Sequence, residues 1–61
     1  MKKEWLTLKE VQELLNYSSR NPVYRFARLN GIRVSKPTGT HYFNYADIMA
    51  VFEAKAVRMG V

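Results

Sequence analysis

Residues 16–31 read NYSSRNPVYRFARLNG, a run that opens with turn-forming residues and continues as an amphipathic helix. Pro22 suits the first turn of a helix, where the N–H that proline lacks would have no partner. Gly31 suits the position just after a helix, because glycine adopts positive φ without strain. The run therefore predicts a helix that ends at Gly31. Three residues could cap its start: Ser18, Ser19 and Asn21.

This predicted helix has two different sides. One side is apolar apart from a single amide and consists of Val23, Phe26, Ala27 and Asn30. The other side is polar and basic and carries Arg20, Asn21, Tyr24, Arg25 and Arg28. Such a helix can pack through its apolar side while its polar side stays free to bind a partner.

Toward the N-terminus, Thr7 and Glu10 have the spacing of a capping box, in which each side chain bonds the other residue's backbone N–H. Apolar residues then recur at helical spacing, which predicts a helix from Leu8 to Leu15. Only a few residues separate this helix from the next one, so the two should cross at a steep angle. Two helices joined in this way form a helix-turn-helix.

Beyond the second helix, the apolar repeat changes to a period of two. Ile32 and Val34 alternate with polar residues, residues 36–39 read KPTG, and a return strand follows from Thr40 to Phe43. This pattern predicts a short β-hairpin. Two strands alone are marginally stable, so one face of the hairpin should rest on the helices.

A third helix is predicted after the hairpin. Asn44 is placed to cap it, and Asp47 lies in its first turn, where a carboxylate favours the positive helix end. The helix should run to about Arg58 and stop at Gly60. Two of its apolar residues are expected in the core: Met49 and Phe52.

Residues 1–61 are predicted to form one domain, because 61 residues build only one small core. The fold class is mostly α with a small β-hairpin, in the order helix, helix, hairpin, helix of a winged helix-turn-helix.

The chain has no Cys, which excludes disulfides and is typical of a cytoplasmic protein. No apolar run approaches the roughly 20 residues of a membrane span. Neither a phosphate-binding loop nor catalytic-triad spacing is present, so we expect no enzymatic activity, metal or cofactor.

The basic residues are concentrated in the middle of the chain. The net charge is +5, and every Asp and Glu lies outside residues 15–46. The two ends are neutral in sum, and the excess comes from Arg20, Arg25, Arg28, Arg33 and Lys36. A cluster of one sign on so small a body creates a field that attracts polyanions. Double-stranded DNA is the partner that this pattern favours, and a solvated basic face without a partner is the alternative.

Two groups of residues are candidates for DNA contacts. The major groove admits one helix, and Arg and Asn make paired hydrogen bonds to guanine and adenine there. The candidates on the second helix are Ser19, Arg20, Asn21, Tyr24, Arg25 and Arg28. The hairpin would act as a wing on the adjacent backbone or minor groove, through Arg33, Lys36, Thr38 and Thr40. His41 is expected to pack against the edge of the core.

Three segments match the pattern of a known family. Residues 5–15, WLTLKEVQELL, resemble its opening, an apolar residue followed by Leu-Thr-x-Lys-Glu-Val-Ala-Glu-Leu-Leu. Residues 23–26, VYRF, resemble its Val-Tyr-Arg-Leu. Residues 39–48, GTHYFNYADI, resemble its wing strand and the Pro-Arg-Glu-Asp-Leu that begins its last helix. The family is the excisionase-type, MerR-like winged helix-turn-helix family, and the resemblance covers about residues 5–53.

The resemblance implies a sequence-specific, non-enzymatic DNA-binding protein. It would act as an excisionase, a recombination directionality factor at phage or mobile-element attachment sites, or as a small transcription regulator. The resemblance also implies cooperative binding of several copies and, for excision, a tyrosine integrase as the partner. Small phage terminase subunits carry a similar domain, so a protein-interaction module is the hypothesis from another class. Residues 18–22, SSRNP, are longer than the family's Ser-x-x-Thr, which leaves open which of Ser19, Arg20 and Asn21 faces the groove.

Overall fold

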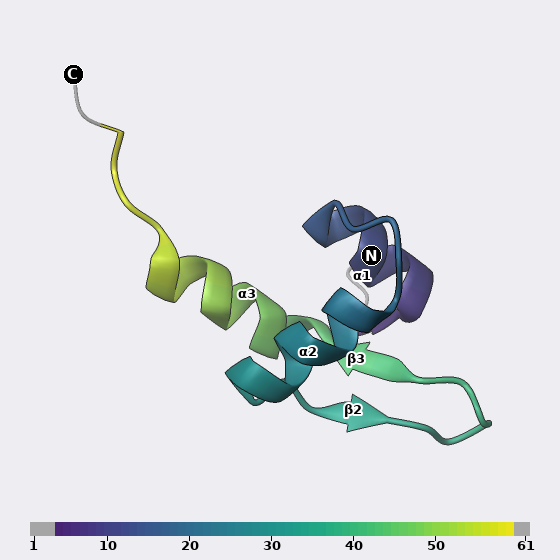
Figure 1. Ribbon diagram of the computed structural model, residues 1–61. Helices are drawn as coiled ribbons and strands as arrows, with labels where there is room; N and C mark the ends of the chain where they lie inside the picture. The colour runs from purple at the N-terminus through teal and green to yellow at the C-terminus, as the bar shows by residue number, and fades with distance from the viewer. Residues whose placement is uncertain (1–3, 60–61) are drawn as a thin grey trace.

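The computed structural model describes residues 4–59 as three helices and a three-stranded antiparallel sheet (Figure 1). In chain order the elements are β1 (Trp5–Thr7), α1 (Leu8–Leu15), α2 (Asn21–Asn30), β2 (Val34–Ser35), β3 (Tyr42–Asn44) and α3 (Tyr45–Lys55). The predicted order of helix, helix, hairpin and helix is confirmed. None of the helices within residues 4–59 has the length and apolar character needed to cross a lipid bilayer.

The sheet has one strand more than the sequence predicted. Its strand order is β1-β3-β2, so β3 lies in the middle. Phe43 of β3 is paired with Leu6 of β1 on one side and with Val34 of β2 on the other. The prediction missed β1 because a strand of three residues is too short to show an alternating pattern, and its partner lies far along the chain. The third strand gives the hairpin the sheet neighbour that two strands alone would lack.

The start of α1 follows the predicted capping box. The Thr7 backbone N–H donates to Glu10 Oε1 at 2.9 Å, and the Glu10 backbone N–H donates to Thr7 Oγ1 at 3.2 Å. The helix ends at Leu15, as predicted, because Asn16 adopts the left-handed conformation with φ of 61°. Asn tolerates this conformation better than most residues with a side chain.

The start of α2 differs from the prediction. None of Ser18, Ser19 and Asn21 caps the helix: the N-cap is Arg20, whose side chain makes no capping hydrogen bond. Its backbone is already helical, with φ of −84° and ψ of −28°, and its carbonyl accepts the N–H groups of Val23 and Tyr24 at 3.0 and 3.2 Å. Gly31 ends the helix as predicted, with φ of 64°.

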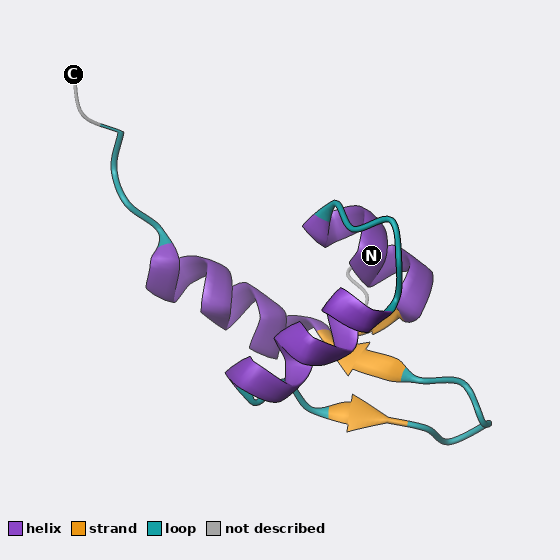
Figure 2. Cartoon of the chain, viewed as in Figure 1, coloured by secondary structure: helices purple, strands orange, loops and turns teal. Residues whose placement is uncertain are grey.

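Helix α3 begins as predicted and ends earlier. Asn44 Oδ1 accepts the Asp47 backbone N–H at 2.9 Å. The helix stops at Lys55 instead of Arg58, and residues 56–59 extend away from the body (Figure 2). Val57 and Met59 are 84% and 85% exposed, so no packing holds a further helical turn in place. The predicted stop at Gly60 lies outside the described residues.

Every helix contributes to one small core. Its buried residues are Val11, Val23, Ala27, Ile32, Phe43 and Ile48. Of the two α3 residues expected in the core, Met49 packs against it, whereas Phe52 is 42% exposed. The expectation for Phe52 was wrong because α3 extends past the other elements, so its second half has fewer neighbours to pack on.

Candidate nucleic-acid interface

Helix α2 presents three arginines to solvent. Val23 and Ala27 are buried and fix one side of the helix to the core. Arg25 and Arg28 of α2 and Arg20 at its N-cap are all exposed. At 3.6 residues per turn Arg25 and Arg28 lie about 60° apart on the side away from the core, whereas Arg20 lies near the angular position of Ala27 and is exposed because it precedes the helix. None of their guanidinium groups forms an ion pair with another residue of the range 4–59. The three side chains are therefore available to a partner.

The N-terminal end of α2 adds to this positive surface. The first turn contains no acidic residue, and its N-cap is Arg20. A cation at the positive end of a helix costs stability, whereas an anion there stabilises by about 0.3–1 kcal/mol. Asn21 and Ser19 are also exposed at this end. The arrangement favours an external anion close to the start of α2.

Arg33, a predicted wing residue, is held by α3. The Arg33 Nε donates to Asp47 Oδ2 at 2.9 Å, and Nη2 donates to Oδ1 at 3.1 Å. The Arg33 backbone N–H also donates to Oδ2, at 2.9 Å. These hydrogen bonds lower the pKa of the Asp47 carboxyl and raise the pKa of the Arg33 guanidinium. The Arg33 side chain stays 68% exposed, so its outward N–H groups remain accessible. The structure thus gives Arg33 a fold-stabilising contact in addition to its predicted role.

The contact between Arg33 and Asp47 predicts a pH-dependent loss of stability. Because folding lowers the pKa of Asp47, the contact contributes stability above the unfolded value of about 3.9, and this is lost as pH falls through the folded value. We expect Asp47→Ala to lower the thermal unfolding midpoint at pH 6, and the difference from wild type to shrink as pH falls toward 2. Circular dichroism melts between pH 2 and 6 measure the difference.

The matched control is Glu53→Ala, because Glu53 is an exposed carboxylate on the same helix that makes no ion pair with any residue of the described range. Glu53→Ala should not change how the thermal unfolding midpoint depends on pH. A gap between wild type and Asp47→Ala that stays constant down to pH 2 would show that the pair makes no ionic contribution.

The other predicted wing residues lie at the loop end of the hairpin, which reaches beyond the helices (Figure 2). Lys36 and Thr38 are exposed there, and Gly39 turns the chain with φ of 88°. Thr40 precedes β3 and is not part of a strand, contrary to the prediction. It borders a hollow shared with α1. Lys36 is therefore an exposed cation at the loop end of the hairpin, with no ion pair to another residue of the range 4–59.

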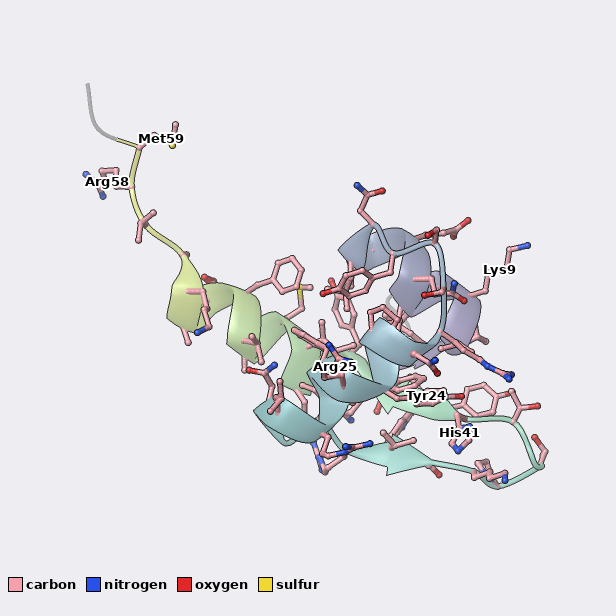
Figure 3. All side chains as sticks on the ribbon, viewed as in Figure 1. Lys9, Tyr24, Arg25, His41, Arg58 and Met59 are labelled. Carbon is pink, nitrogen blue, oxygen red and sulfur yellow. The ribbon has the colours of Figure 1, made fainter. Side chains whose placement is uncertain are left out.

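Tyr24 and His41 form a contact that the sequence did not predict. They point toward each other between α2 and the hairpin (Figure 3), with the Tyr24 hydroxyl 3.2 Å from His41 Nδ1. Their rings meet edge to face with centroids 5.3 Å apart, and the Tyr24 ring also lies 6.0 Å from that of Phe43. Tyr24 was predicted to contact a phosphate or a sugar, and its hydroxyl now has an internal partner as well. No local sequence pattern could have indicated His41, because its partner lies on another element.

Comparison of the chain with protein-family models, curated proteins and solved structures finds no match. Within residues 4–59, no group of three His, Asp or Glu side chains is placed to hold a metal ion.

Proposed function

We propose that this chain is a winged helix-turn-helix domain that binds duplex DNA and has no catalytic activity of its own. The observation that carries the proposal is the exposure of Arg25 and Arg28 on α2 and of Arg20 at its N-cap, none of them ion-paired within residues 4–59, on a helix whose other side is buried in the core. Helix α2 would enter the major groove, which is wide enough for one helix. The hairpin would lie on the flanking backbone.

The residues of α2 divide into two roles in this proposal. Asn21 and Arg25 lie in its first half, the part that meets base edges in helix-turn-helix proteins, and Arg20 immediately precedes it as the N-cap. Their side chains can make paired hydrogen bonds to guanine or adenine. Arg28 lies further along the helix and would contact phosphate, as would Lys36 at the hairpin loop. Base contacts would set the sequence preference, and phosphate contacts would set orientation and general affinity.

The biological role that we propose is that of an excisionase acting in the cytoplasm at attachment sites, with transcription regulation as the related alternative. This step is supported by the resemblance of residues 5–53 to excisionase-type sequences. A single module of this size buries about 600–1,000 Å² on DNA, which reads only a few base pairs. Several copies side by side, or a tyrosine integrase as partner, would supply the missing specificity.

A salt titration tests the proposal against its opposite, a protein-interaction module whose basic face docks an acidic partner. Each neutralised phosphate changes the slope of log K against log salt by about −0.9. Among the candidate DNA contacts, four cations have no carboxylate partner in the range 4–59: Arg20, Arg25, Arg28 and Lys36. These four cations predict a slope of log K against log salt of about −3.6, and a contribution from Arg33 would make the slope steeper, about −4.5.

The measurement is fluorescence anisotropy of a labelled duplex between 50 and 200 mM salt. A polyglutamate peptide with the same net charge as the duplex serves as the matched competitor for the basic face of the protein. A slope near zero, or an absence of duplex binding at the lowest salt, would reject the DNA-binding function. Tighter binding to polyglutamate than to duplex would support the protein-interaction module instead.

A further inference from the structure

A shallow groove of about 450 Å³ separates α2 from the hairpin. It is lined by Tyr24, Ala27, Arg28, Ile32, Val34 and His41. Three of these side chains are apolar, and the other three carry a hydroxyl, a guanidinium and an imidazole. No carboxylate from the described residues lines the groove. A groove that offers donors and cations around an apolar floor is suited to a small anion.

The hydrogen bond between Tyr24 and His41 couples the protonation of the imidazole to the role of the hydroxyl. When His41 is neutral, Nδ1 accepts the Tyr24 O–H in the tautomer with its proton on Nε2, and donates to the Tyr24 oxygen in the tautomer with its proton on Nδ1. When His41 is protonated, both ring nitrogens are donors, and Nδ1–H must donate to the Tyr24 oxygen. The Tyr24 O–H can then donate to another acceptor. Protonation therefore adds a positive charge to the groove and, whichever tautomer preceded it, leaves the Tyr24 hydroxyl proton free to donate.

We propose that this groove binds a backbone phosphate of duplex DNA, and that protonation of His41 strengthens the contact. The inference rests on the proposed function and assigns that function a site and a pH dependence. Arg28 supplies a permanent charge, the Tyr24 hydroxyl a hydrogen bond, and the His41 imidazolium a second charge. The titratable or charged groups that line the groove together with His41 are Tyr24 and Arg28 of α2, and the remaining lining residues do not titrate.

The sign of the effect follows from linkage. A phosphate favours the charged imidazole over the neutral one, so the complex binds more protons than the free protein. DNA affinity must then rise when a fall in pH protonates His41. His41 is the single histidine of the chain, so no other imidazole can produce this response.

The test compares wild type with His41→Gln by fluorescence anisotropy at pH 7.5 and 5.5. We expect wild type to bind duplex about fivefold tighter at pH 5.5, since a hydrogen bond to a charged group is stronger than one to a neutral group. Its salt slope should steepen by about 0.9, the value for one more phosphate contact. His41→Gln should show neither change. Tyr24→Phe, which keeps the ring, should bind more weakly than wild type at pH 5.5, where the hydroxyl is released.

A measurement on wild type alone keeps the inference testable if His41→Gln does not fold. The NMR signals of the His41 ring, titrated with and without duplex, should show a midpoint that moves to higher pH in the complex. An unmoved midpoint, or equal pH dependence in wild type and His41→Gln, would overturn the phosphate site while leaving DNA binding intact. No duplex binding at either pH would instead reject the proposed function itself.

Discussion

Replacing Phe43 with Ala is expected to lower the free energy of unfolding by about 3–5 kcal/mol. Phe43 is 1% exposed and belongs to the central strand, where it is paired with β1 on one side and β2 on the other. Truncating a buried Phe to Ala costs about 3–5 kcal/mol, because burial is lost and a cavity remains. A domain of 61 residues has a total stability of about 3–9 kcal/mol. The substitution therefore removes much or all of the available stability.

Phe52→Ala is the matched control for Phe43→Ala. It deletes the same atoms from a ring that is 42% exposed on α3, and we expect a loss of about 1 kcal/mol or less. Urea denaturation followed by circular dichroism measures both variants. Equal losses for the two variants would contradict the assignment of Phe43 as the centre of the core. Phe43→Leu, which keeps an apolar group at the same position, should restore a folded protein.

The elements that the sequence predicted well are those with strong local signals. Thr7 and Glu10 are three residues apart and bond each other, so the start of α1 could be placed from the sequence. The same holds for Gly31, which ends α2, and for Asn44, which caps α3. In each case the residues that determine the structure lie within one helical turn of each other. Interactions between neighbouring residues are then sufficient to predict these helix ends from the sequence.

The features that the sequence did not reveal depend on contacts between distant residues. Strand β1 exists because Leu6 meets Phe43, and its own three residues carry no alternating pattern. Arg33 was predicted as a free wing cation, yet it lies beside Asp47 because the chain turns back from the hairpin into α3. The local pattern gives the charge of a side chain but not its neighbour. For the candidate site, the basic side of α2 was therefore predictable, whereas the internal partners of Tyr24 and Arg33 were not.

Arg25→Ala is expected to remove most of the preference of the protein for one DNA sequence over another. Arg25 lies almost opposite the buried side of α2, since helical spacing places it roughly 160–200° from Ala27 and Val23. A guanidinium in this position is directed toward whatever α2 faces, which in a major groove is the edge of a base. A paired contact to guanine discriminates by about 1–3 kcal/mol, or roughly 5- to 150-fold in affinity.

The experiment must separate lost sequence preference from lost charge. Selection from a random duplex library first identifies the preferred sequence of wild type, and affinities are then measured for that sequence and for a scrambled one. Lys36→Ala removes the same charge from the hairpin loop and should weaken both duplexes alike, with a salt slope smaller by about 0.9. Arg58→Ala, in the extended segment after α3, should change neither affinity.

If Arg25→Ala weakens binding to both duplexes equally, as Lys36→Ala does, Arg25 contacts phosphate and another residue of α2 must read the bases. If the ratio of the affinities for the preferred and the scrambled duplex falls toward one only in Arg25→Ala, this guanidinium contacts a base edge.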